Sequence, residues 1–225
     1  MTEGDFCFSG FTMNDLVLTG WTGAEFARIA GETVPLITQY AERHGLAWRV
    51  CDLRGSRPPS WQKLTHMLAG LVAHERVIWI DADVVVLDPS VNLLDEMPDG
   101  AWQGVVEHET NCGTVPNCGV WVVTRAMEAT LEHAWRCGRY INHPWWEQAA
   151  ILESMGYTVT DSPTATLDTP TRLHQYTAFL NPTWNHHPHD SRRVDAPRFV
   201  HVTQYHDRLS AVRAFAQRAH ASAPH

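Results

Sequence analysis

Residues 77–86 read VIWIDADVVV, so two apolar runs flank the carboxylates Asp81 and Asp83. A short apolar run of this kind is typical of a strand that is buried on both faces. In open sheets of such strands, ligands bind beyond the carboxyl ends, where Asp81 comes. Residues i and i+2 of an extended chain project to one side, with Cα atoms about 6.5 Å apart. We therefore expect both carboxylates to converge on one divalent cation, Mn²⁺ or Mg²⁺.

Strand and helix patterns alternate before this stretch. Residues 15–19 and 46–51 read as strands, and a helical repeat of apolar residues between them stops at Gly45. A second helix is expected from Ser60, as its N-cap residue, to about Ala73. This order predicts parallel pairing with right-handed crossovers. The fold class is therefore α/β, Rossmann-like, with a mostly parallel central sheet flanked by helices.

The remaining chain has a mixed pattern. We expect strands at 101–106, 119–124 and 198–203, helices at 125–136, 145–155 (opened by Pro144) and 209–219, and a long loop at 181–197. The 225 residues fit one domain.

Composition excludes some classes of protein. The formal net charge of -8 disfavours a nonspecific grip on nucleic acid, which depends on Lys and Arg. The sequence has no run of about 18 apolar residues, so we expect no membrane span. The first residues lack the pattern of a secretory signal. Five irregularly spaced cysteines argue against a disulfide framework and favour a cytoplasmic protein. Cys112 and Cys118 have a poor spacing for zinc.

Two other interpretations of the aspartate pair stay open. Asp81 could cap a loop while Asp83 is solvated, although two aspartates in an apolar run are costly without a partner. The pair also matches the opening motif of haloacid-dehalogenase-like phosphatases, in which the first Asp attacks phosphorus. That motif ends the first strand of its fold, whereas here strands and helices precede it. No Asp-Asp or Gly-Asp-x-x-x-Asp pattern follows residue 83 either.

Several motifs in order resemble the GT-A glycosyltransferases, in particular the retaining galactosyl-, mannosyl- and xylosyltransferase family. The resemblance covers roughly residues 15–208 and rests on the order of the motifs more than on any one of them. The motifs are YAERHG at 40–45, WQK at 61–63, IDAD at 80–83, NCGVW at 117–121, WWEQAA at 145–150 and FVH at 199–201.

This resemblance implies a metal-dependent enzyme that moves a sugar from a nucleotide-diphosphate sugar to an acceptor, with retention of configuration. It places Asp81, Asp83 and His201 at the metal and Lys63 beside the donor phosphates. The alternative for His201 is a loop histidine whose hydrogen bonds are satisfied within the fold. The alternative for Lys63 is a surface lysine at the start of a helix. After His201 the sequence VTQY replaces the family's glycine-bearing phosphate turn. Arg208 is therefore the candidate for a diphosphate contact there.

The resemblance also implies residues on the sugar side. Asn117 and Gly119 would line the cleft for the sugar and the acceptor, unless they form an ordinary turn before a strand. Glu147 or Gln148 would face the transferred sugar, where an acidic or amide group can stabilise an oxocarbenium-like centre. The alternative for Glu147 is an exposed helix position.

The donor base and the acceptor are less well specified. Thr19, Gly20 and Trp21 follow the first predicted strand and are candidates for contacting the base, with a UDP-sugar favoured. NPTWN at 181–185 resembles an acceptor-side element of the family. The histidines after it could hold a second metal or belong to a solvated loop; they are His186, His187 and His189.

On this interpretation, one GT-A domain spans residues 1–225. It has a nucleotide-binding half at about 15–90, an acceptor and sugar half at about 91–208, and a C-terminal helix at about 209–220. The acceptor would be a saccharide, a small molecule or a modified nucleobase. A catalytically silent protein that binds a nucleotide or saccharide remains an alternative.

Overall fold

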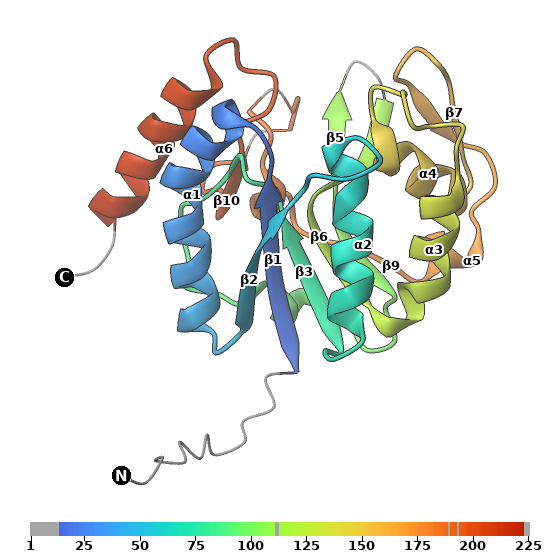
Figure 1. The fold of residues 1–225 in the computed structure, drawn as a ribbon, viewed down its shortest axis with the longest axis horizontal. Helices are drawn as coiled ribbons and strands as arrows, with labels where there is room; N and C mark the ends of the chain where they lie inside the picture. Colours follow the sequence, from blue (N-terminus) through green and yellow to red (C-terminus); the bar gives the residue numbers. More distant parts are fainter. Residues whose placement is uncertain (1–13, 111–112, 189, 193, 223–225) are drawn as a thin grey trace, which may run out of the picture.

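The computed structural model describes residues 14–110, 113–188, 190–192 and 194–222 (Figure 1). Its centre is a six-stranded sheet in the order β2-β1-β3-β6-β5-β9. Strand β1 is parallel to β2 and β3, and β5 is parallel to β9, whereas β6 is antiparallel to both of its neighbours. The α/β fold with a mostly parallel sheet is therefore confirmed. The strands are β1 (Asp15–Trp21), β2 (Ala47–Asp52), β3 (Arg76–Ile80), β5 (Gln103–Thr110), β6 (Gly113–Thr124) and β9 (Thr177–Phe179).

Helices cover both faces of this sheet. Figure 1 shows α1 and α6 on one side and α2, α3 and α4 on the other. The side chains of β1 alternate between two cores, with Val17 facing α1 and its neighbours Leu16 and Leu18 facing α2. The helices are α1 (Ala24–Arg43), α2 (Pro59–Leu71), α3 (Glu128–Arg136), α4 (Trp146–Met155), α5 (Arg172–Gln175) and α6 (Arg208–Ser222). The short 3-10 turns are η1 (Leu93–Glu96), η2 (Arg125–Met127) and η3 (Pro182–Asn185).

Two small antiparallel pairs lie outside the main sheet. Strand β7 (Tyr157–Val159) pairs with β8 (Ala165–Leu167). Strand β4 (Val84–Val86) pairs with β10 (Phe199–His201) in a register that places His201 opposite Val84. Because Val84 follows Asp83, this pairing brings a late histidine beside the aspartate pair.

Several expected boundaries were wrong in detail. Helix α2 begins at Pro59, with Pro58 rather than Ser60 at its N-cap position. Proline fits the first helical turn because it has no N–H to lose there. Pro144 lies before α4, whose N-cap residue is Trp145. The stretch expected as one helix at 125–136 divides into η2 and α3, and the long loop at 181–197 begins with η3.

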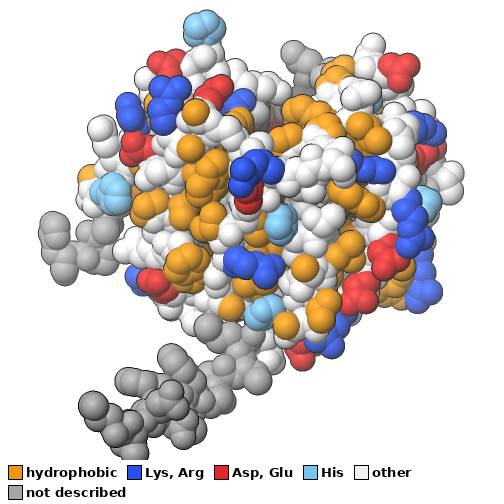
Figure 2. All heavy atoms as spheres, in the orientation of Figure 1, with side chains coloured by type: hydrophobic (Ala, Val, Ile, Leu, Met, Phe, Trp, Pro, Cys, Tyr) orange, Lys and Arg blue, Asp and Glu red, His pale blue; other side chains and the backbone are white. Residues whose placement is uncertain are grey.

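Figure 2 shows acidic and basic side chains interspersed over one described face of the molecule. Among the described residues, no helix combines the length and apolar character needed to cross a membrane.

Candidate functional site

The turn between β3 and β4 carries both aspartates. The backbone N–H of Val84 donates to the carbonyl of Asp81 at 3.0 Å, so these residues turn instead of running extended as predicted. Helix α1 anchors the turn, because the Thr33 hydroxyl donates to the carbonyl of Ala82 at 2.7 Å. The expected convergence of the two carboxylates therefore comes from a tight turn and not from strand geometry.

Asp81, Asp83 and His201 form one cluster. One potential ligand atom from each lies within 4.8 Å of the others. The Nε2 atom of His201 is 3.4 Å from Asp83 Oδ1 and 3.9 Å from Asp81 Oδ2. Asp83 and His201 are buried, and Asp81 is partly exposed. Two carboxylates and an imidazole are a ligand set that suits a cation such as Mn²⁺.

The two buried members of the cluster perturb each other. Burial disfavours the charged imidazole of His201, but the Asp83 carboxylate outweighs this and raises the pKa of His201. Burial also opposes ionisation of Asp83, and the nearby His201 and Arg208 reverse that effect and lower its pKa. Asp83 is therefore held as a carboxylate, the form that binds a cation.

Gly119 on β6 lies directly against the imidazole of His201. A Cβ atom at residue 119 would lie 2.3 Å from His201 Cε1 and 2.8 Å from Asn117 Oδ1. That Asn117 oxygen accepts hydrogen bonds from the Gly119 N–H at 2.9 Å and from Asn185 Nδ2 at 2.8 Å. Asn117 and Gly119 are thus brought to the cluster, where the glycine leaves room for the histidine ring.

Lys63 of α2 is buried beside the cluster. Its Nζ lies 3.2 Å from Asp81 Oδ1 and 2.8 Å from Glu147 Oε1, and it donates to the carbonyl of Cys118 at 3.3 Å. Burial lowers the pKa of Lys63, but the carboxylates of Asp81 and Glu147 raise it by more than burial lowers it. The net shift of the pKa is therefore upward. The Trp79 Nε1–H also donates to Asp81 Oδ1, at 2.6 Å. One oxygen of Asp81 is therefore held by the protein, and the other faces His201.

Glu147 and Gln148 open helix α4. Glu147 is buried at 3% exposure, contrary to the surface alternative, and burial raises its pKa while Lys63 partly offsets the shift. Its Oε2 atom has no hydrogen-bond partner among the described residues. Gln148 instead uses its side-chain oxygen to accept from the Cys118 N–H at 3.1 Å. Glu147 thus belongs to the charged cluster, and Gln148 fixes the adjacent stretch of β6.

Arg208 begins α6 and faces the cluster from the opposite side. Its guanidinium lies 3.4 Å from Asp83 Oδ2 and packs over the ring of Phe26. In the preceding turn, Gln204 has a φ of 63°. A glycine adopts that left-handed conformation without strain. The turn therefore keeps a glycine-like backbone although the sequence lacks the glycine.

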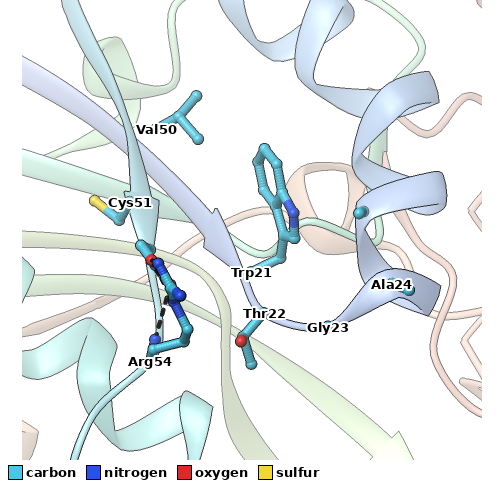
Figure 3. Close-up of a pocket in the computed structure, with 9 residues that line it drawn as sticks. Trp21, Thr22, Gly23, Ala24, Val50, Cys51 and Arg54 are labelled. Atoms are coloured by element: carbon cyan, nitrogen blue, oxygen red, sulfur yellow. Dashed lines mark hydrogen bonds and ion pairs between the residues drawn. The ribbon is translucent and has the colours of Figure 1, made fainter.

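A cavity of about 610 Å³ lies beyond the carboxyl ends of β1 and β2. Figure 3 shows the Trp21 ring standing between Val50 on β2 and Ala24 at the start of α1. Thr19 is buried within β1, and Gly20 packs against Cys51, so of the three base-contact candidates only Trp21 lines the cavity. Its lining residues are Trp21, Thr22, Gly23, Ala24, Ala27, Val50, Cys51, Asp52 and Arg54.

Sequence reasoning missed several of these residues. Asp52 is the last residue of β2 and Arg54 comes two residues later, and this position at the carboxyl end of a strand was the signal that could have identified them. Asn185, which bonds to Asn117, and Trp79, which bonds to Asp81, had no comparable signal. Both depend on contacts that sequence spacing does not show.

The histidine loop does not form a second metal cluster in the described structure. Among the described residues, Asp81, Asp83 and His201 are the one group of three or more His, Cys, Asp or Glu side chains that could hold a metal ion. The centroid of the His187 ring is 5.3 Å from that of His108 and 6.5 Å from that of His201. His189 and Cys112 lie outside the described residues.

No protein-family model and no curated protein matches the chain. The structure is similar to a glycosyltransferase involved in glycosylation of the major capsid of PBCV-1, with a TM-score of 0.64 and 15% identity over 90% of this chain and 98% of that one. It is also similar to the galactosyltransferase LgtC, solved with donor and acceptor sugar analogs, with a TM-score of 0.59 and 11% identity over 93% and 97%. A third is GlyE of Streptococcus pneumoniae TIGR4, with a TM-score of 0.55 and 12% identity over 89% and 59%. This chain has the fold of the GT-A glycosyltransferases.

Proposed function

We propose that the chain is a metal-dependent glycosyltransferase that takes its sugar from a nucleotide-diphosphate donor, with a UDP-sugar favoured. The observation that carries the proposal is the convergence of Asp81, Asp83 and His201 at one edge of the fold. Lys63, Glu147 and Arg208 surround this cluster with further charge. The likeness of the fold to solved glycosyltransferases supports the same assignment.

The cavity beside β1 and β2 suits the nucleoside part of the donor. It lies beyond the carboxyl ends of parallel strands, where α/β sheets bind ligands. Trp21 offers an aromatic face to a base, and Asp52 and Arg54 offer polar groups to its edge or to the ribose. The diphosphate would then extend from this cavity toward the aspartate cluster.

The cluster fits a divalent cation by its chemistry. Asp81, Asp83 and His201 would hold the ion, and Gly119 leaves the space that the imidazole needs. A bound cation of this kind offsets the negative charge that a diphosphate develops as it leaves. The guanidinium of Arg208 contacts Asp83 Oδ2. If Asp83 binds the ion, Arg208 could bind a phosphate oxygen of the donor instead.

Lys63 and Glu147 act on the two ends of the breaking bond. The raised pKa of Lys63 keeps its ammonium charged beside Asp81, where it can bind the departing phosphate. The unpartnered Oε2 of Glu147 is free to accept from a sugar hydroxyl or to stabilise positive charge at the anomeric carbon.

Transfer with retention would then need no enzyme nucleophile. The acceptor oxygen would form its bond to the anomeric carbon on the face from which the diphosphate leaves, and a phosphate oxygen would take the acceptor proton. The phosphatase alternative is not favoured, because β1, α1, β2, α2 and β3 all precede Asp81, whereas the phosphatase motif ends the first strand of its fold.

The test is release of free nucleotide from a panel of nucleotide sugars in the presence of Mn²⁺. We expect cleavage of at least one donor, loss of activity with EDTA and recovery with Mn²⁺. Asp83→Asn should abolish the reaction, while Asp99→Asn, the same change at an exposed position, should not. Full activity of Asp83→Asn would refute the metal site. Cleavage of p-nitrophenyl phosphate instead of any nucleotide sugar would indicate a phosphatase.

A further inference from the structure

Trp146 is a tryptophan that the fold leaves in solvent next to the charged cluster. We propose that its ring is the stacking surface for a sugar ring of the acceptor, so that the acceptor is a saccharide. The inference rests on the proposed function and adds to it a residue that selects the second substrate.

The position of Trp146 ties it to the cluster through the chain itself. It is the first residue of α4, and the next residue is Glu147, which is ion-paired to Lys63 at 2.8 Å. Adjacent Cα atoms are about 3.8 Å apart. A molecule resting on Trp146 would therefore lie one residue along the chain from the glutamate that we assign to the transferred sugar.

The exposure of this ring contrasts with that of other tryptophans in the chain. Trp61, Trp79, Trp121 and Trp184 are completely buried, whereas 43% of Trp146 is exposed. Its neighbour Glu147 is only 3% exposed. The start of α4 thus buries a carboxylate and presents an indole to solvent, the reverse of what solvation alone favours.

The backbone at Trp146 is unusual as well. Its φ is 43°, and among the described residues Gln204 is the one other non-glycine residue with a positive φ. Glycine and asparagine accept this conformation more readily than a bulky aromatic residue. An aromatic side chain in this strained position needs an explanation beyond local folding.

The surrounding hydrogen bonds hold this conformation in place. The Trp146 N–H donates to the carbonyl of His143 at 2.9 Å, and the Trp145 N–H donates to the His143 Nδ1 at 3.0 Å. His143 is buried, and its Nε2 donates to the carbonyl of Thr160 at 2.8 Å. The indole is therefore mounted on a rigid turn, which suits a surface that positions a ligand.

The chemistry around Trp146 selects a neutral ring. An indole face attracts the apolar C–H face of a pyranose as well as a nucleobase. A nucleic acid would also require cations for its phosphates. Residues 140–155 contain no Lys or Arg, and their two carboxylates are paired with residues outside this range, Glu147 with Lys63 and Glu153 with Arg139, which leaves no unpaired cation in this stretch. A neutral saccharide fits this surface, and a polyanion does not.

The test begins with the wild-type protein and the donor that it hydrolyses without an acceptor. Methyl pyranosides of glucose, galactose, mannose and xylose are then added, and the acceleration of nucleotide release gives KM and kcat for the acceptor. We expect at least one pyranoside to accelerate the release. Donor hydrolysis that no pyranoside accelerates would overturn the inference and leave the proposed function intact. No hydrolysis of any donor would refute the proposed function itself.

Variants then test the ring. Trp146→Asn, which keeps a residue tolerant of positive φ, should raise the acceptor KM about tenfold, equivalent to about 1.4 kcal/mol of binding free energy. The donor KM of Trp146→Asn should change much less. Trp146→Phe keeps an aromatic ring, so its acceptor KM should be close to that of the wild type. Trp48→Ala removes an equally exposed tryptophan, at 45%, from β2 and should leave the acceptor KM unchanged. Equal changes in the donor and acceptor KM, or none in either, would overturn the inference.

Discussion

Replacing Gly119 with alanine would drive a methyl group into the imidazole of His201. The added Cβ would lie 2.3 Å from Cε1 and 2.5 Å from Nδ1 of that ring. Carbon atoms in contact are normally about 3.5–4.0 Å apart, so the ring would have to move by about 1 Å or more. Retreat is limited, because His201 is buried and its backbone N–H is bonded to the carbonyl of His186 at 2.9 Å.

The displaced ligand should weaken metal binding more than it weakens the fold. Disturbing the shell that orients a metal ligand typically lowers affinity about 10–100-fold, and overpacking costs about 1–3 kcal/mol of stability. We therefore expect Gly119→Ala to bind Mn²⁺ at least about tenfold more weakly. It should remain folded, with a lower unfolding temperature.

Isothermal titration with Mn²⁺ and thermal unfolding with and without the ion measure both effects. Gly31→Ala provides the matched control, because a Cβ at this exposed position of α1 meets nothing within 4 Å. Alanine there should stabilise the helix by about 0.5–1 kcal/mol and leave Mn²⁺ affinity unchanged. If Gly119→Ala binds Mn²⁺ as tightly as the wild type does, His201 is not a ligand and the site must be reassigned.

Three further predictions address buried groups. Lys63→Met leaves Asp81 and Glu147 without their cation and should destabilise the fold by about 3–5 kcal/mol in urea unfolding; a loss below 1 kcal/mol would contradict the buried pairing. Glu147→Gln should lower kcat far more than it changes nucleotide affinity, and an equal effect on both would remove its role beside the sugar. Burial lowers the pKa of His108 to about 3 in the folded protein. As the pH falls below about 6.5, His108 is therefore protonated in the unfolded chain but still neutral in the folded protein. Stability should therefore decline by about 2 kcal/mol between pH 7 and pH 5, and His108→Gln should show a shallower decline in the same urea titration.

The family resemblance predicted that Asp81, Asp83 and His201 lie together, and the structure brings their side chains into one cluster. Asp81 directly follows β3, where the apolar strand pattern placed it, whereas His201, the last residue of β10, was assigned through the resemblance. The turn geometry of residues 81–83 was not predicted, since a two-residue spacing fits an extended strand as well as a turn. The contact between Gly119 and the His201 ring depends on how β6 and β10 approach each other, which no local pattern records.

The limits of sequence reasoning are also visible at the donor end. Of the three residues predicted to contact the base, Trp21 ends β1 and lines the cavity, whereas Thr19 and Gly20 are engaged in packing. Asp52, which lies opposite Trp21 in the strand register, and Arg54 are at the carboxyl end of β2 and were not predicted, because charged residues near a predicted loop are common on protein surfaces. The antiparallel placement of β6 between β3 and β5 likewise follows from tertiary packing and not from its apolar pattern.

The pairing of β4 with β10 has a consequence for how the protein is made. Strand β4 follows Asp83 directly, whereas β10 belongs to the last part of the chain. A ribosome makes the aspartate pair well before His201, so a nascent chain lacks the imidazole of this cluster until residue 201 has emerged. If the cluster binds a cation as proposed, tight uptake would therefore follow the pairing of β10 with β4, and a chain cut short before residue 199 would lack both the imidazole and the strand that pairs with β4.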